Sequence, residues 1–130
     1  MHLKIITSDK IVFDDDADAI YTRGTDGEFG VLPNHIPLMS ALDIGVTKVV
    51  QGDKIKYFTT MGGVFQFKDN EALILTTTAE DGNNIDVARA KAAMERAKTI
   101  LEEHDAEIDA KRAEAAIARA KARLKASLSE

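Results

Sequence analysis

The chain of 130 residues contains no cysteine, which excludes disulfides and thiolate metal sites. It also lacks any apolar run that approaches the roughly 18–20 residues needed to span a bilayer. The first residues carry no long apolar segment of the kind found in a signal peptide. These absences predict a soluble, cytosolic protein that does not insert directly into a membrane.

The motifs of common catalytic and metal sites are also missing. There is no Gly-x-x-x-x-Gly-Lys phosphate loop and no His-Glu-x-x-His. The three histidines (His2, His35 and His104) lie far apart without the spacing of metal ligands, and no Ser/His/Asp grouping stands out. We therefore expect a non-catalytic protein with no required cofactor. An enzyme built on a β-sandwich scaffold is the alternative.

Charge is distributed unevenly along the chain. The net charge of −5 argues against general nucleic-acid binding, so no nucleic-acid partner is expected. Residues 1–82 carry 7 basic and 13 acidic side chains, whereas residues 83–130 carry 10 and 9. Within the second region, basic residues cluster between Lys111 and Lys125 and face only Glu114. Such a basic helix is usually a solvated face, although binding to a polyanion or to an acidic groove of a partner is the other interpretation.

Glycine and proline are absent after residue 82, so residues 80–90 join two different regions. Residues 81–84 read Asp-Gly-Asn-Asn, which predicts a turn because Gly and Asn tolerate positive φ. Asp86 is placed to cap a helix that begins there. Arg89 follows three residues later on the same helical face, so a local ion pair is the simplest interpretation of the two residues.

The first region reads as many short strands separated by turn residues. Gly52-Asp53 is a hairpin signal, and Gly62-Gly63 and Asp69-Asn70 predict further turns. The alternating apolar pattern indicates an antiparallel β-sandwich or a flattened barrel. The predicted strands are 3–6, 11–13, 19–22, 27–33, 38–42, 46–51, 54–60, 64–67 and 72–76.

The second region reads as two helices within residues 86–126, with a turn near His104 to Glu107. Apolar residues recur at three- and four-residue steps, but most of them are alanine. Small side chains allow close packing as an antiparallel hairpin and bury little area, at about 25 cal/mol per Å2. Because the turn contains no Gly or Pro, the sequence also permits one straight helix of about 40 residues.

Four arginines follow helical spacing in this region. Arg89 and Arg96 lie seven residues apart on the first helix, and Arg119 and Arg123 lie four apart on the second. If the helices fold back on each other, the four guanidiniums converge on one anion, and guanidinium forks suit phosphate oxygens. Solvated surface arginines are the alternative.

Three motifs resemble the epsilon subunit of bacterial F-type ATP synthase, and the resemblance covers essentially the whole chain. The first is Gly-Glu-Phe-Gly-Val-Leu-Pro-Asn-His-Ile-Pro at residues 27–37, and the second is Gly62-Gly63. The third, residues 85–90, matches the family's Ile/Leu-Asp-x-x-Arg-Ala motif at every fixed position. The resemblance implies a β-sandwich of about ten strands over residues 1–82 and a helical hairpin over residues 83–130.

The resemblance also implies partners and a place in the cell. Such subunits lie at the foot of the rotating central stalk, against the gamma subunit and the c ring, on the cytoplasmic face of the bacterial membrane. Glu28 and His35 would face the c ring. The extended hairpin would enter the alpha/beta hexamer and block ATP hydrolysis. Its inhibitory contacts would be Lys111, Arg112, Lys121 and Lys125.

Some members of the family bind ATP on the compact form of the hairpin as a regulatory ligand. The motif carries this over to Ile85, Asp86, Arg89 and Ala90. Glu80 and the arginines Arg96, Arg119 and Arg123 match the family's further positions. The opposing hypothesis is a free-standing nucleotide sensor, which predicts a sandwich surface without exposed apolar patches.

Overall fold

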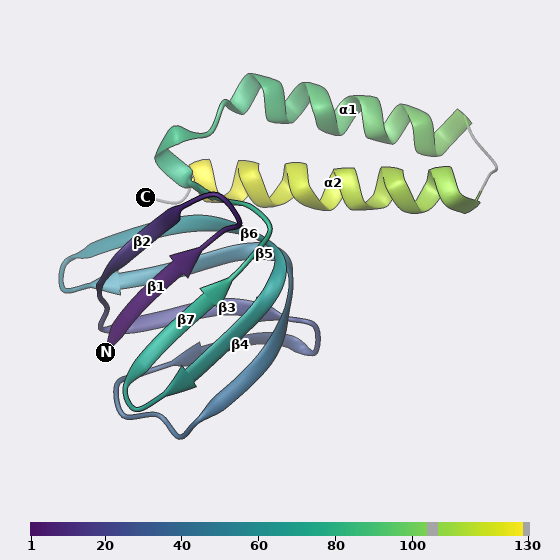
Figure 1. The fold of residues 1–130 in the computed structure, drawn as a ribbon. Helices are drawn as coiled ribbons and strands as arrows, with labels where there is room; N and C mark the ends of the chain where they lie inside the picture. Colours follow the sequence, from purple (N-terminus) through teal and green to yellow (C-terminus); the bar gives the residue numbers. More distant parts are fainter. Residues whose placement is uncertain (104–106, 129–130) are drawn as a thin grey trace.

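The computed structural model describes residues 1–103 and 107–128, and it places the strands first and the helices last (Figure 1). The strands are β1 (His2–Ile6), β2 (Ile11–Asp16), β3 (Ala19–Gly24), β4 (Gly27–Val31), β5 (Leu38–Gln51), β6 (Lys54–Lys68), β7 (Glu71–Leu75) and β8 (Ala79–Asp81). A 3-10 turn, η1 (Gly82–Asn84), leads into α1 (Val87–Glu103) and α2 (Glu107–Leu128).

The strands form one hydrogen-bonded sheet in the order β2-β1-β7-β6-β5-β3-β4, with β8 on the first part of β6. The long strands β5 and β6 run through both layers of the sandwich, as Figure 1 shows. Residues 38–42 and 64–68 lie in the layer of β1, β2 and β7. The later part of β5 pairs with β3, and β3 pairs with β4 in the second layer.

Alternation along the strands fills the space between the layers. Phe58, Phe65 and Phe67 are fully buried on β6, and Leu3 on β1 and Ile20 on β3 are fully buried in the same core. Because strand side chains alternate between two faces, each layer places one row in this core and one row outside it. The sandwich predicted from the alternating pattern is confirmed.

Two details of the sandwich differ from the sequence prediction. Residues 1–103 and 107–128 contain eight strands instead of about ten, because residues 43–45 and 61–63 continue β5 and β6 where the sequence predicted breaks. The sandwich is also not entirely antiparallel, since β1 pairs with β7 in parallel. A parallel pair requires a long connection, and more than sixty residues separate these two strands.

Gly63 allows β6 to pass from one layer to the other. Its φ of +114° is accessible to glycine alone among the common residues. A Cβ at this position would also overlap the carbonyl oxygen of Leu75. The Gly62-Gly63 pair is therefore a bend inside a strand rather than the turn that the sequence predicted.

The two helices form the predicted hairpin. Of the turn predicted near His104 to Glu107, residues 104–106 lie outside the described residues, and Glu107 begins α2. In Figure 1, α2 lies between α1 and the sheet. It packs on β5, β6 and η1, whereas α1 packs mainly on α2. Among the described side chains of the two helices, the buried ones are Ala90, Ala97, Ala113, Ala120, Ala122 and Ala126.

Candidate functional site

Asp86 caps α1, as the sequence predicts. Its Oδ1 accepts a hydrogen bond from the backbone N–H of Arg89 at 3.0 Å, and its carbonyl accepts from Ala90 at 3.0 Å. The turn before it is capped in the same way, because Asp81 Oδ1 accepts from the backbone N–H of Asn83 at 3.0 Å. Two side-chain caps therefore fix the path of the chain between the sandwich and the hairpin.

A hollow of about 470 Å3 lies where this junction meets both helices. Its volume is within the range of about 300–1,000 Å3 that is typical of small-molecule sites. Three guanidiniums and two carboxylates border it, so its formal charge is positive. The lining residues are Glu80, Asn84, Asp86, Arg89, Ala90, Ala93, Arg96 and Arg123.

Arg123 is the one arginine of the hollow that is held by a carboxylate. Its Nε donates to Glu80 Oε1 at 2.8 Å, and both side chains are about one-third exposed. Within the described part of the chain, the guanidiniums of Arg89 and Arg96 have no ion-pair partner. Two unpaired guanidiniums beside a partly neutralised third form a site suited to an anion with several oxygens.

The structure brings six of the eight residues predicted for ATP around this hollow. Ile85 is half-buried in the extended link between η1 and α1, outside the lining. Arg119 is half-buried one turn before Arg123 on α2 and is also outside the lining. Asn84 and Ala93 line the hollow although the sequence analysis did not select them. Two features of the sequence could have identified them: the Asn-Asn pair in the turn points to Asn84, and the three-residue helical step from Ala90 points to Ala93.

The last turns of α2 hold the hairpin on the sandwich. A Cβ on Gly82 would overlap the carbonyl oxygen of Ala126 and would lie 3.2 Å from that of Tyr57. On the other side of the helix, Lys125 Nζ lies 3.9 Å from Glu28 Oε1, and both side chains are about two-thirds exposed. Docking therefore depends on close backbone packing at Gly82 and on ion pairs near residue 125.

The four basic residues predicted for inhibitory contacts all lie on α2 with exposed side chains. Lys111 and Arg112 are near the start of the helix, whereas Lys121 and Lys125 border a hollow between α2 and the sheet. Glu28, which the resemblance assigns to the c ring, therefore lies beside α2 in the docked state.

His35 lies in the loop after β4, away from the helices in sequence and structure. Its Nδ1 is 2.7 Å from the carbonyl oxygen of Ile36, and its ring meets the edge of Phe67 at a centroid distance of 5.9 Å. The neighbouring Asn34 donates its backbone N–H to Asn70 Oδ1 at 2.9 Å. These contacts fix the loop against the β6–β7 turn and leave Ile36 75% exposed.

The outer face of the β1-β2-β7 layer carries an unbroken apolar row. Strand register aligns Ala41 with Val64, Val64 with Leu75, Leu75 with Ile6, and Ile6 with Ile11. These five residues, here called the apolar row, are exposed or half-buried, with 47% of Leu75 and 56% of Ile11 accessible. A contiguous exposed apolar surface of this kind is typical of protein interfaces.

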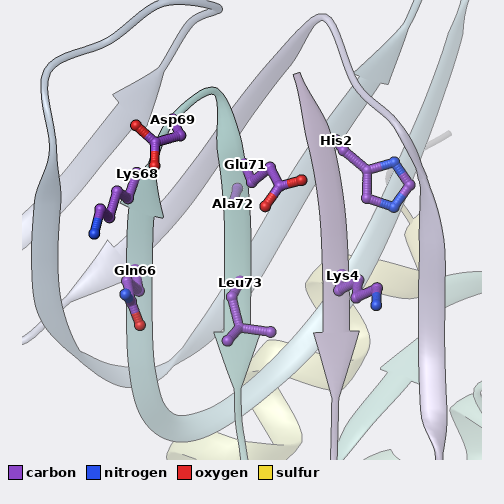
Figure 2. A pocket seen from close by; sticks show the side chains of 8 residues that line it. All are labelled: His2, Lys4, Gln66, Lys68, Asp69, Glu71, Ala72 and Leu73. Carbon is purple, nitrogen blue, oxygen red and sulfur yellow. The ribbon is translucent and has the colours of Figure 1, made fainter.

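Two further rows of side chains follow the apolar row along the same strands, and most of their residues are polar or charged. Gln66, Leu73 and Lys4 form the next row, and Lys68, Glu71 and His2 form the one after it (Figure 2). They surround a shallow hollow of about 310 Å3. Hydrogen bonds to Asp14 and then to Asp16 raise the pKa of His2 above its ordinary value of 6.5.

No helix in residues 1–103 or 107–128 is long and apolar enough to cross a membrane. The same residues contain no group of three or more His, Cys, Asp or Glu side chains arranged to hold a metal ion.

Two family models match the chain. The model described as "ATP synthase, Delta/Epsilon chain, beta-sandwich domain" covers residues 1–82, and "ATP synthase, Delta/Epsilon chain, long alpha-helix domain" covers residues 83–127. The ATP synthase epsilon chain of Desulforamulus reducens is 42% identical over 125 residues, covering 96% of this chain and 95% of the relative. That of Pelotomaculum thermopropionicum is 46% identical, with coverages of 96% and 93%.

Solved structures give the same result for the fold. A chain in the cryo-EM structure of the Euglena gracilis mitochondrial ATP synthase (OSCP/F1/c-ring) superposes with a TM-score of 0.84 at 26% identity. The match covers 97% of this chain and 79% of that one. A chain of the Tetrahymena thermophila mitochondrial ATP synthase (central stalk/c-ring) has a TM-score of 0.66 at 16% identity, covering 97% and 95%, and supports the fold alone.

Proposed function

Because the chain belongs to the ATP synthase delta/epsilon chain family, we propose that it is a non-catalytic rotor subunit that also regulates ATP hydrolysis. The sandwich, residues 1–82, contacts the gamma subunit and the c ring and couples ring rotation to the catalytic head. The hairpin, residues 83–130, inhibits hydrolysis when it extends into the alpha/beta hexamer. ATP bound at the arginine-lined hollow favours the docked hairpin.

The apolar row is the observation that supports a stalk position over a free-standing nucleotide sensor. Five apolar side chains aligned across five strands, with Val64 40% and Leu75 47% exposed, have no covering element among the described residues. Burial of this row by a partner contributes about 25 cal/mol per Å2 of apolar surface. We assign the row to the gamma subunit, and the loop of His35, together with Glu28, to the c ring.

Gel filtration with and without the gamma subunit tests this assignment. We expect the wild-type chain to elute with gamma and Leu75→Lys to elute separately, because a lysine in the centre of the row places a charge in the interface. Ile55→Lys is the matched control, since Ile55 is 39% exposed and lies outside the row. Complex formation by Leu75→Lys as strong as that of Ile55→Lys would assign gamma to another surface.

The hollow supports ATP as the regulatory ligand. Arg89, Arg96 and Arg123 come from both helices, whereas Glu80 comes from β8, so an anion bound here contacts the sandwich edge and the hairpin together. A ligand that binds only the docked state stabilises it by RT ln(1 + [ATP]/Kd), about 2.7 kcal/mol at a hundredfold excess over Kd. That contribution is large for a hairpin in which the buried side chains that the structure describes are all alanines.

The Glu80–Arg123 ion pair orients one of the arginines of the proposed ATP site. Arg123 Nε donates to Glu80 Oε1 at 2.8 Å, and this bond positions the guanidinium at the edge of the hollow. Each guanidinium has five N–H donors, and the bond to Glu80 uses one of them. The remaining donors of Arg123 and those of Arg89 and Arg96 are available to phosphate oxygens.

Calorimetric titration of ATP into the isolated chain tests the site. Arg123→Ala should weaken ATP binding at least tenfold, because it removes a charged donor set from the phosphates. Arg112→Ala is the matched control, since Arg112 is an exposed arginine of the same helix outside the hollow. Equal affinities for the two variants would place ATP elsewhere and leave the arginines as surface or partner-binding residues.

Inhibition requires the hairpin to leave the sandwich, and the docked contacts allow this. Within the described residues, α2 packs on the sheet and on η1, whereas α1 packs mainly on α2. The buried residues of this part of α2 include the small Ala122 and Ala126, and Ala126 lies against Gly82 of η1. The Lys125–Glu28 pair is too exposed to contribute more than about 1 kcal/mol. Undocking releases the basic face of α2 to meet acidic segments of the alpha and beta subunits.

A further inference from the structure

A second hollow lies on the outer face of the layer that contains β3 and β4, beside the last turns of α2. Its volume is about 360 Å3, within the range of about 300–1,000 Å3 that is typical of small-molecule sites. Among the described residues, it shares none of its lining with the arginine-lined hollow, so the proposed ATP site does not account for it. Because Tyr21 and Tyr57 line it, we call it the tyrosine hollow.

Strand register forms the floor of the tyrosine hollow from one row of side chains. Gly30 on β4 pairs with Tyr21 on β3, and Tyr21 pairs with Lys48 on β5. Lys48 in turn pairs with Tyr57 on β6. Ile20, next to Tyr21 along β3, is buried in the core, so the alternation of side chains places this row on the outer face of the layer.

Gly30 allows the ring of Tyr21 to lie flat against the sheet. A Cβ on Gly30 would be 2.7 Å from Cδ1 and 2.8 Å from Cε1 of this ring, so the ring occupies the space that a side chain would fill. Tyr21 is 45% exposed, and Tyr57 is half-buried. Aromatic rings contact one another offset-stacked or edge to face, and the hollow offers two rings for such contacts.

Two lysines make the tyrosine hollow positive. Lys48 Nζ lies 5.6 Å from the centroid of the Tyr21 ring, and Lys125 reaches the hollow from α2. Glu28 is the single carboxylate among the described residues that line it, and its Oε1 lies 3.9 Å from Lys125 Nζ. Two ammonium groups therefore outweigh one carboxylate beside an aromatic surface, and this combination suits a ligand with a flat ring and a negative charge.

We propose that the tyrosine hollow binds a small aromatic anion of the carboxylate or sulfonate class. Its ring packs against Tyr21 and Tyr57, and its anionic group contacts Lys48 and Lys125. Because Lys125 belongs to α2 whereas the other groups belong to the sandwich, the complete site exists only in the docked state. A ligand bound there favours the docked hairpin, since it has a higher affinity for that state.

A fluorescence titration of the full chain with 8-anilinonaphthalene-1-sulfonate, an aromatic sulfonate, tests the proposal. Lys48→Met should weaken binding of this probe about fivefold, because it removes a charge beside the ring and keeps an apolar chain there. Lys54→Met is the matched control, since Lys54 is an exposed lysine of β6 that does not line the hollow. Tyr21→Ala should also weaken binding, and circular dichroism checks that each variant is folded.

Two further measurements test the charge and the link to docking. N-phenyl-1-naphthylamine has the same ring systems without the sulfonate, so Lys48→Met should leave its affinity unchanged. Glu28→Gln should strengthen binding of the sulfonate, because it removes the negative charge from the lining. Hydrogen exchange in α2 should slow when the sulfonate is bound, and unchanged exchange would contradict the preference for the docked state.

Other binding sites for the sulfonate give different results. Equal affinities of Lys48→Met and Lys54→Met would overturn the proposal. Loss of binding in Leu75→Lys, with none in Lys48→Met, would place the probe on the apolar row. Displacement of the probe by ATP would place it in the arginine-lined hollow, whereas continued binding in a chain that fails to bind ATP would support the tyrosine hollow and contradict only the proposed ATP site.

Discussion

The two interfaces of this molecule are built from different side chains. Between the sheet layers lie large residues such as Phe58, Phe65 and Leu3, all fully buried. Among the residues of the two helices whose burial the structure describes, the buried ones are all alanines. Because hydrophobic stabilisation follows apolar area, the layers are held together far more strongly than the hairpin is held to them. This difference is what the proposed function requires, because in that proposal the hairpin undocks while the sandwich stays folded.

The largest expected effect is a defect in the interface between the layers. Phe58→Ala should lower the free energy of unfolding by about 3–5 kcal/mol, because it removes a buried ring from the core. Denaturant unfolding monitored by circular dichroism measures this. Ala97→Ser, on the hairpin, should change the same unfolding transition much less. Equal losses would show that both interfaces belong to one cooperative unit.

The second-largest expected effect is a weaker docking of the hairpin on the sandwich. Gly82→Ala places a Cβ against the Ala126 carbonyl, and overpacking of this kind costs about 1–3 kcal/mol. The φ of Gly82 is not in the left-handed region, so the substitution does not strain the turn itself. Hydrogen exchange should accelerate in α2 and remain unchanged in β5, with Asn83→Ala as the control. Unchanged exchange in α2 would mean that Gly82 does not limit docking.

A smaller effect is expected at the start of α1. Asp86→Ala removes the side-chain cap on the Arg89 N–H and should destabilise the helix by about 1 kcal/mol. Amide exchange of the first turn of α1, measured without nucleotide, reports this loss. Asp81→Ala serves as the comparison, because it removes the cap of η1 and leaves that of α1. Retained protection in Asp86→Ala would show that packing on α2 alone fixes the helix start.

The smallest expected effect is the pH dependence of folding stability that arises from His2 at the edge of the sandwich. The pKa of His2 is raised by Asp14 and then Asp16, so the charged ring favours the folded state. This stabilisation is fully present below about pH 6.5, the ordinary pKa of His, and is lost as pH rises through the higher folded-state pKa. An NMR titration of the ring should show a midpoint above 6.5, and Asp14→Asn should lower it. An identical midpoint in that variant would contradict the assigned cause.

Local features of the fold were predictable from the sequence, and features that depend on distant pairing were not. The Asp86 cap and the alanine stripes follow from helical spacing and were predicted correctly. The break expected at Gly62-Gly63 was wrong, because a positive φ can mark a bend inside a strand as well as a turn. The parallel pairing of β1 with β7 joins strands from opposite ends of the first region, and no local pattern indicates it.

The residues of the arginine-lined hollow and of the apolar row could also be predicted only in part, because their positions depend on distant pairing. Helical spacing grouped four arginines, but Arg119 is not among those that line the hollow, because the hollow lies at the end of α2 beside Glu80. The apolar row was also not predictable in position, because it depends on the register of five strands. What the sequence did indicate was contiguous apolar residues at 73–75, where a strand with one exposed face should alternate.

One measurement tests the central claim that ATP selects the docked hairpin. Because the chain has no cysteine, spin labels at Asp53→Cys and Glu114→Cys report only the distance between the sandwich and α2. In the chain bound to a cysteine-free gamma subunit, ATP should shift the distances to a single short population. The same shift should require at least tenfold more ATP in Arg123→Ala. A distance distribution unaffected by millimolar ATP, or an equal response in both proteins, would contradict the account.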